Sequence, residues 1–212
     1  MKLKKIVSSI LLLGLLNSCI GSLFIVEKRH YNYEFKSFSK KINFEKGQWL
    51  LNPISSTSFG NYETSTNEIL KDFLISELGN RLQVTSELKD ENHKYLIPFE
   101  IHFDNVKENI KYLKNVSNCD YIISAKIFYL DDTRDIDVDK NHRGKNLNKK
   151  EYKSACKISL VAHDLKTENE IFNLDCLGYI WIDDENDDKI AIHQTSKSAS
   201  HSVMRKIIKK IK

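Results

Sequence analysis

Two acidic clusters of the chain come closest to the carboxylate spacing of a metal-binding motif. They comprise Asp131, Asp132, Asp135, Asp137 and Asp139, and then Asp183, Asp184, Glu185, Asp187 and Asp188. The alternation Asp135-x-Asp137-x-Asp139 matches the opening of a calcium-binding EF-hand loop. Lys140 then stands where that loop needs glycine, and Asn146 where it needs a bidentate glutamate. We therefore predict solvated loops and no metal site, with divalent-cation or small-ligand binding as the alternative.

The histidines have no catalytic or metal-ligating spacing. They are His30, His93, His102, His142, His163, His193 and His201. The sequence contains no HExxH pair, and no serine in a G-x-S-x-G turn that would set up a nucleophile for His163 and Asp164. The glycines are isolated, so no glycine-rich phosphate loop is encoded. We predict a protein that is not an enzyme and takes no cofactor, with a hydrolase as the remaining alternative.

The cysteines match no zinc pattern, because no C-x-x-C pair occurs among the 4 of them. Cys156 and Cys176 fall on two expected strands joined by a turn near residues 166–169. The sequence does not decide whether a disulfide joins them or whether both are buried free thiols, because the strand register determines whether the two cysteines share a face. Cys119 lies just before another expected strand, and Cys19 follows the apolar run at the amino terminus.

Residues 1–18 have the three parts of a signal peptide. Three lysines open the segment, an apolar run covers residues 6–16, and the tetrapeptide Leu-Asn-Ser-Cys ends at Cys19. The apolar run is shorter than the roughly 20 residues that cross a bilayer as a helix. This length favours a cleaved signal peptide over a transmembrane anchor.

The tetrapeptide ending at Cys19 resembles the lipobox of bacterial lipoproteins. Leu16 lies three positions before the cysteine, and the small Ser18 lies directly before it. The resemblance implies cleavage before Cys19, a diacylglyceryl thioether on its sulfur, and acylation of the new amino terminus. Each buried methylene contributes about 0.8 kcal/mol, and two or more acyl chains hold a soluble body stably to a membrane. An ordinary cysteine after a conventional signal peptide is the alternative.

The residue after Cys19 bears on the choice of membrane. In well-studied lipoproteins an aspartate at this position resembles an inner-membrane retention signal, whereas here Ile20 follows the cysteine. We therefore expect attachment to the outer membrane on its periplasmic face, with the inner membrane as the alternative.

The charge is nearly balanced once the signal peptide is removed. The chain carries a formal +4, and subtracting Lys2, Lys4 and Lys5 leaves +4 − 3 = +1. A nearly neutral domain is a poor candidate for nucleic-acid binding, which depends on counterion release. The one basic cluster comprises Arg205, Lys206, Lys209, Lys210 and Lys212. We interpret this cluster as the solvated face of a last helix, with a membrane-surface or acidic-partner patch as the alternative.

Short runs of apolar residues, some of them alternating with polar residues, predict the strands of the domain. The expected segments are Tyr31–Phe35, Trp49–Ile54, Tyr95–Phe103, Tyr121–Tyr129, and a hairpin of Ala155–Ala162 with Ile171–Ile182. Pro53 and the serines after it are expected to end the second of these strands. We assign residues 19–47 to a lipidated amino terminus and lead-in, and residues 48–212 to a periplasmic α/β domain.

Helical spacing of apolar residues predicts three helices. The first begins near Ser65, where Ser65 and Glu68 fit a capping box, the second near Asp104, and the last near Ala191. Their expected apolar stripes are Ile69, Leu70, Phe73, Leu74, Leu78 and Leu82; Val106, Ile110, Leu113 and Val116; and Ala199, Val203, Ile207 and Ile211. The element order predicts a single α/β or α+β domain. Its mixed β-sheet carries two to three packed helices and a C-terminal helix.

Four short segments carry a family resemblance. They are the strand Leu50–Ile54, the helix end from Glu77 to Leu82, Asn118-Cys119-Asp120-Tyr121-Ile122-Ile123, and the turn Asp164-Leu165-Lys166-Thr167. Their order is similar to the periplasmic lipoprotein domains of the curli-secretion-channel subunit, of the TolB amino-terminal domain and of penicillin-binding-protein activators. The resemblance implies the fold and a binding role, and no functional residue is carried over.

These observations together predict a membrane-anchored periplasmic lipoprotein without catalytic activity. Its partners are expected to be the membrane, through lipid on Cys19, and another envelope protein or further copies of itself. Nucleic acid is not expected as a partner.

Overall fold

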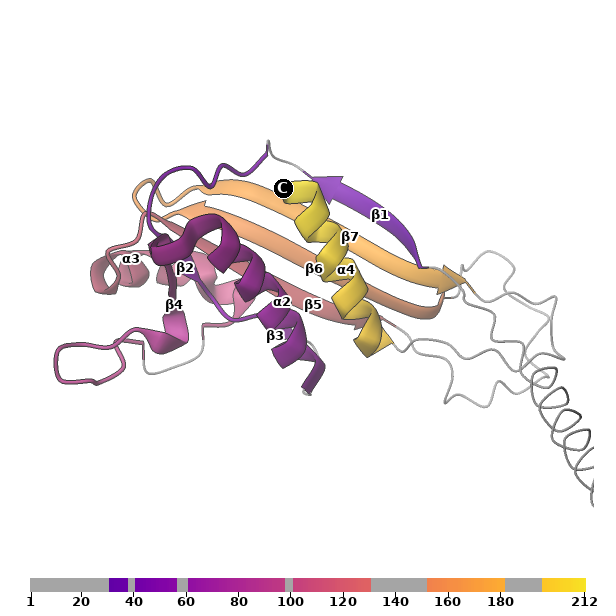
Figure 1. The fold of residues 1–212 in the computed structure, drawn as a ribbon, viewed down its shortest axis with the longest axis horizontal. Helices are drawn as coiled ribbons and strands as arrows, with labels where there is room; N and C mark the ends of the chain where they lie inside the picture. The colour runs from indigo at the N-terminus through magenta and orange to yellow at the C-terminus, as the bar shows by residue number, and fades with distance from the viewer. Residues whose placement is uncertain (1–30, 38–40, 57–60, 98–100, 131–151, 182–195) are drawn as a thin grey trace, which may run out of the picture. The chain divides into compact units, whose positions relative to one another are not determined.

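A mixed β-sheet of seven strands runs through the part of the chain that the structure, a computed structural model, describes (Figure 1). That part comprises residues 31–37, 41–56, 61–97, 101–130, 152–181 and 196–212. All of it belongs to one compact unit, formed by Tyr31–Trp181 and Gln194–Lys212. The expected signal peptide, Cys19 and both acidic clusters lie outside the described residues. None of the described helices is long and apolar enough to cross a membrane.

The strand order across the sheet is β1-β7-β6-β5-β2-β4, with β3 paired to β5. The strands are β1 Asn32–Ser37, β2 Trp49–Leu51, β3 Ser55–Ser56, β4 Leu82–Val84, β5 Tyr121–Leu130, β6 Tyr152–Asp164 and β7 Glu170–Trp181. β2 is parallel to β4 and β5, β3 is parallel to β5, and the β1, β7, β6 and β5 pairs are antiparallel. The predicted mixed sheet and single α+β domain are confirmed.

Helices cover both faces of the sheet. α2 (Asn61–Leu78) and α4 (Ser196–Ile211) pack on one face, and α3 (Val106–Val116) packs on the other. α2 connects β3 to the edge strand β4, and α3 lies on the return path from β4 to β5. The chain crosses the sheet in one direction from β2 to β4 and in the other direction from β4 to β5. Right-handed connections that run in opposite directions place their helices on opposite faces of the sheet, which accounts for the separation of α2 from α3.

The alternation of side chains divides the core into two layers. Trp49, Leu51 and Ile123 lie in the larger layer, beneath α2 and α4, whereas Leu50 and Ile122 lie in the smaller layer, beneath α3. All five side chains are fully buried. Both faces of β2 and of the start of β5 are therefore apolar, as expected for central strands that are covered on both sides.

The start of α2 differs from the prediction. The helix begins at Asn61, so Ser65 lies inside it and the expected capping box with Glu68 is wrong. The carboxylate in the first turn belongs to Glu63, which accepts a hydrogen bond from the Ser56 hydroxyl. An acidic group in the first turn is favoured by the helix dipole.

The end of α2 and the strands near it also differ. The helix ends at Leu78, and Leu82, which was expected on its apolar stripe, belongs to β4 instead. The short strand β4 was not predicted at all. The serines expected to end the second strand form β3, where Ser55 pairs with Lys126 of β5.

The strand expected over Tyr95–Phe103 is wrong for its described residues. Residues 88–96 fold back on themselves: the Leu96 N–H donates to the Leu88 carbonyl at 2.9 Å, and Lys89 pairs with Tyr95. The inward residues of the expected strand, Ile97 and Ile101, are buried beneath α3 without strand pairing. Apolar alternation therefore identified the buried side chains here but not the backbone conformation.

The remaining elements agree with the prediction. α3 follows a single 3-10 turn (Phe103–Asn105) that includes the expected start at Asp104, and its stripe is buried apart from the partly buried Val116. β6 and β7 form the expected hairpin. In its turn the Asp164 carboxylate accepts hydrogen bonds from the N–H groups of Lys166 and Thr167, at 2.7 and 2.9 Å. α4 buries the predicted Ala199, Val203, Ile207 and Ile211 together with Met204. The expected start of this helix near Ala191 lies outside the described residues.

Candidate functional site

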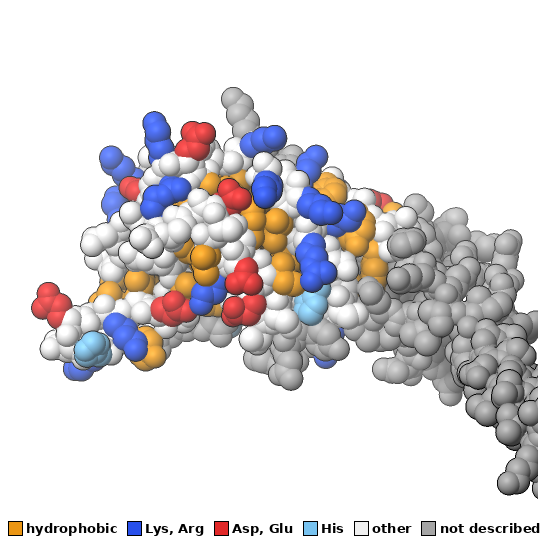
Figure 2. Space-filling model, viewed as in Figure 1, with side chains coloured by type: hydrophobic (Ala, Val, Ile, Leu, Met, Phe, Trp, Pro, Cys, Tyr) orange, Lys and Arg blue, Asp and Glu red, His pale blue; other side chains and the backbone are white. Residues whose placement is uncertain are grey.

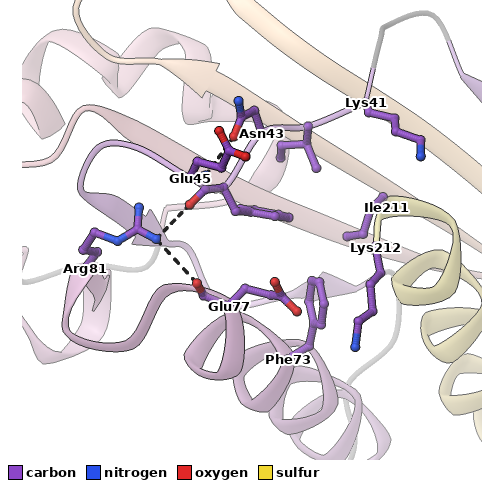
Figure 3. A pocket seen from close by; sticks show the side chains of 10 residues that line it. Lys41, Asn43, Glu45, Phe73, Glu77, Arg81, Ile211 and Lys212 are labelled. Carbon is purple, nitrogen blue, oxygen red and sulfur yellow. Dashed lines mark hydrogen bonds between the residues drawn. The ribbon is translucent and has the colours of Figure 1, made fainter.

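A groove of about 570 Å³ opens where the lead-in segment passes between the ends of α2 and α4 (Figure 3). The lining residues are Lys41, Ile42, Asn43, Phe44, Glu45, Phe73, Glu77, Arg81, Ile211 and Lys212. They come from three regions that are distant in sequence, so the groove exists only in the folded domain. We name it the lead-in groove.

Arg81 fixes the wall that the lead-in segment forms. Its Nη2 donates to the Phe44 carbonyl at 2.8 Å (Figure 3), and its Nη1 donates to the Gly47 carbonyl at 3.3 Å. Nη2 also lies 3.5 Å from the Glu77 carbonyl of α2. One guanidinium therefore connects the lead-in segment to the end of α2, which a single ammonium group cannot do with the same geometry.

The floor of the groove is aromatic and aliphatic. The Phe44 ring centroid lies 5.1 Å from that of Trp49 and 6.0 Å from that of Phe73. Ring pairs at these separations add to the stabilisation that apolar burial provides. Ile211 of α4 completes this apolar surface.

A glycine lets the lead-in segment reach this position. Gly47 has a φ of +82°, and a Cβ there would lie 2.5 Å from the Tyr121 ring. Neither that backbone conformation nor that space suits another residue. After the glycine, the Gln48 N–H donates to the Asp120 carboxylate at 2.9 Å, so the segment enters β2 beside the start of β5.

Both signs of charge line the rim. Lys41 and Lys212 supply ammonium groups, and Glu45 and Glu77 supply carboxylates, with the Glu77 side chain directed along the groove toward Phe73 (Figure 3). The lining therefore combines charged groups of both signs with apolar side chains, of which Phe73 and Ile211 are largely buried.

The carboxyl ends of β2 and β4, where open α/β sheets often bind ligands, are filled by protein groups instead. Asn52 is 1% exposed, and its side-chain amide donates to the Ile101 carbonyl at 2.7 Å. The Thr85 hydroxyl donates a hydrogen bond to the side-chain oxygen of Asn52, at 3.3 Å. Asn52 therefore ties β2, the end of β4 and the segment before α3 together.

The histidines of the described residues remain dispersed in the fold. His93 and His102 are exposed in loops, His201 lies half-buried on α4, and His163 is buried on β6. His30, His142 and His193 lie outside the described residues. Burial lowers the pKa of His163 because the charged imidazolium is poorly solvated there.

His163 and Ser124 do not form a catalytic pair in this structure. Both lie on the α3 side of the sheet, in the paired strands β6 and β5, and both are buried. The Ser124 hydroxyl and the His163 Nδ1 make no hydrogen bond to each other or to another group. Nucleophilic catalysis by serine requires the hydrogen bond between hydroxyl and imidazole.

The three described cysteines are buried free thiols. Cys156 lies opposite Gly178 in the β6–β7 pair, and Cys176 lies opposite Ile158, so no disulfide joins the two cysteines. Burial raises the pKa of Cys119 to about 11, and those of Cys156 and Cys176 to about 12. The reactive thiolate is therefore scarce at neutral pH.

Within the described residues, no three His, Cys, Asp or Glu side chains gather in a way that could hold a metal ion. The acidic clusters considered for a cation, including Asp135 and Asp137, lie outside those residues.

The domain thus belongs to the class of α+β folds with one mixed sheet covered on both faces. No family model and no curated protein match the chain. Among solved structures it is similar to PelC from Paraburkholderia phytofirmans, described as a dodecamer. The identity is 8% and the TM-score 0.46, and the match covers 85% of this chain and 97% of PelC. It is also similar to a hypothetical protein from Chlamydia trachomatis, with 9% identity and a TM-score of 0.38, over 78% of this chain and 93% of the other.

Proposed function

We propose that this chain is a non-enzymatic lipoprotein of the bacterial envelope that binds another envelope protein. Lipid on Cys19 holds it to the periplasmic face of the outer membrane. The observation that carries the proposal is the order of a positive start, a short apolar run and Leu16-Asn17-Ser18-Cys19. Two or more acyl chains at this position hold a folded body to a bilayer without a spanning helix.

The position of the first strand supports a tethered domain. β1 begins at Asn32 and pairs with β7, so residues 20–30 alone separate Cys19 from the described domain. At about 3.5 Å per residue these residues reach at most roughly 40 Å when fully extended. A domain tethered at this distance works close to the membrane surface.

The lead-in groove is the surface that we assign to the partner. Its apolar floor of Phe44, Phe73 and Ile211 lies among charges of both signs, and this combination is typical of a binding hot spot with a polar rim. We infer that the partner inserts one apolar side chain from an extended or helical segment. The charges that flank this side chain complement Glu77 and Lys41.

Photo-crosslinking in cells tests this assignment. A photoreactive amino acid at Lys41 of the full chain should capture one envelope protein in stoichiometric amounts, whereas the same group at the exposed Lys111 of α3 should not. Glu77→Lys should lower the yield at least five-fold, and the matched reversal Glu108→Lys on α3 should leave it unchanged. Equal yields at the two positions would contradict the assignment, as would capture of a second copy of this chain, which would favour self-association.

A further inference from the structure

We propose that the face formed by α4 and β1 binds the anionic phospholipid surface of the membrane that anchors the chain. The proposal rests on the lipid anchor of the proposed function and adds an orientation for the domain. Its cationic residues are Arg205, Lys206, Lys209, Lys210 and Lys212, and its aromatic residues are Tyr33 and Phe35. We name this surface the cationic face (Figure 2).

The cations of this face are exposed and have no acidic neighbours along the helix. α4 contains no Asp or Glu, and the five cationic side chains are all exposed. None of the five forms an ion pair with a residue that the structure describes. Acidic side chains gather over α2 instead, beside the cationic face (Figure 2).

The helix dipole does not account for this pattern. Cations in the last turn of a helix are favoured by its dipole, and Lys209 and Lys210 stand there. The effect falls off within that turn, so Arg205 and Lys206 lie beyond its reach. Arg205, Lys209 and Lys212 follow helical spacing on the side opposite the buried residues, which extends the charge along the helix.

Aromatic rings of β1 extend the face to the edge of the sheet. The Lys206 ammonium lies 4.8 Å from the Tyr33 ring centroid, and the Lys210 ammonium lies 5.9 Å from that of Phe35. Phe35 is 37% exposed. Aromatic rings lie at the headgroup level of membranes, and lysine side chains extend from apolar surroundings to reach phosphates.

Positive charge is concentrated on the cationic face, and the rest of the chain has a net negative charge. Residues 19–212 carry a formal +1, and the five cations of the face contribute +5, which leaves 1 − 5 = −4 for the rest. An anionic surface attracts one side of such a body and repels the remainder, which turns the cationic face toward it.

The tether and the aromatic rings beside the cations favour phospholipid as the ligand. Four of the five cations are lysines, which can bind headgroup phosphates as point charges. β1 is also the first described element after the tether, so lipid on Cys19 would keep this face at a high local concentration near headgroups.

Site-specific crosslinking to lipid in cells tests the proposal. A benzophenone amino acid replaces Phe35 in the full chain, and phospholipids are labelled with radioactive phosphate. The matched control position is Tyr112 of α3, on the opposite face of the sheet, which is 36% exposed against 37% for Phe35. We expect at least five-fold more phosphate label on the protein with the group at position 35.

Charge variants complete the test. The attraction of one cation to an anionic surface corresponds to about five-fold in binding. Lys206→Gln with Lys210→Gln should therefore lower the label at position 35 at least five-fold, and Lys107→Gln with Lys111→Gln on α3 should not. Equal label at positions 35 and 112, no response to the lysine variants, or capture of a protein instead of lipid would each overturn the proposal. Fatty-acid labelling of the same samples reports the anchor separately, so a labelled chain without lipid crosslinks contradicts the cationic face alone.

Discussion

Gly178 of β7 lies directly beneath Val203 of α4, so close that a Cβ on the glycine would be 2.6 Å from a methyl carbon of the valine. Val203 is fully buried, and the Tyr33 ring lies 3.3 Å from the same Cβ position. This contact seats α4 on the sheet and places the cationic face beside β1.

The first prediction is that Gly178→Ala destabilises the domain by about 1–3 kcal/mol, because the new methyl group overpacks the contact. Val203→Ala alone should cost about 2 kcal/mol through lost apolar burial. The double variant should be more stable than the sum of the two effects predicts, by at least about 1 kcal/mol, since the valine methyl that clashes is gone. Urea unfolding of the four proteins measures this coupling. Strict additivity would contradict the described approach of α4 to β7.

The second prediction concerns Arg81. Arg81→Ala should lower the free energy of unfolding by about 1–2 kcal/mol, because the carbonyl groups of Phe44 and Gly47 lose a charged donor. Arg81→Lys should recover only part of this loss. Limited proteolysis should cut between residues 41 and 47 faster in both variants than in the parent chain. A cut elsewhere with the lead-in segment still protected would contradict the role assigned to this guanidinium.

The third prediction concerns the thiols. Burial raises the pKa values of Cys119, Cys156 and Cys176 to about 11–12. A thiol reagent at pH 8 should therefore label none of them in the folded protein, and all three after denaturation without reduction. A lipidated Cys19 is a thioether, so the denatured processed chain should give 4 − 1 = 3 reactive thiols. Only one reactive thiol after denaturation would indicate a disulfide between two of the three.

The fourth prediction is a pH dependence of stability. Burial holds the pKa of His163 below its ordinary value of 6.5, with Glu170 opposing this effect and Lys107 adding to it. The unfolded chain therefore binds a proton before the folded chain does. The contribution of His163 is fully present above about pH 6.5 and is lost as the pH falls from there through the folded-state pKa, with a slope of at most about 1.4 kcal/mol per pH unit.

Replacement of this histidine isolates its contribution. His163→Gln should flatten the decline in unfolding free energy between pH 7 and pH 5. Identical pH profiles for the parent and His163→Gln would show that this imidazole is solvated in the folded state.

The elements that the sequence predicts well are those with a long and regular pattern. The β6–β7 hairpin and β5 are rich in apolar residues over ten or more positions, and the stripe of α4 recurs from Ala199 to Ile211. Burial imposes these patterns directly. The fold class followed from their order along the chain.

Short elements and local competition account for the errors. β4 has 3 residues, too few for an alternation to be recognised. Ser65 resembles a helix cap, yet α2 begins at Asn61, and the Thr66 hydroxyl beside Ser65 makes a hydrogen bond with the Ser200 hydroxyl of α4 at 2.8 Å. Tertiary contacts of this kind are invisible in a local pattern.

The lead-in groove was not predicted from the sequence. Phe44, Arg81 and Lys212 meet only because the chain folds, and no spacing relates them. Gly47 itself was the available signal, since a glycine just before a buried strand can mark a close approach of the backbone. The basic cluster at the end of the chain was visible in the sequence, but its aromatic neighbours on β1 were not.

Metabolic labelling of the full chain with a fatty acid tests the central claim most directly, because we propose that lipid on Cys19 attaches this domain to the membrane. The parent protein should incorporate the label and stay with the membrane fraction after washing with high salt. Cys19→Ser should remove the label and release the protein, whereas Cys119→Ser should change neither result. An unlabelled parent protein, or a Cys19→Ser variant that sediments with membranes as the parent does, would contradict the account.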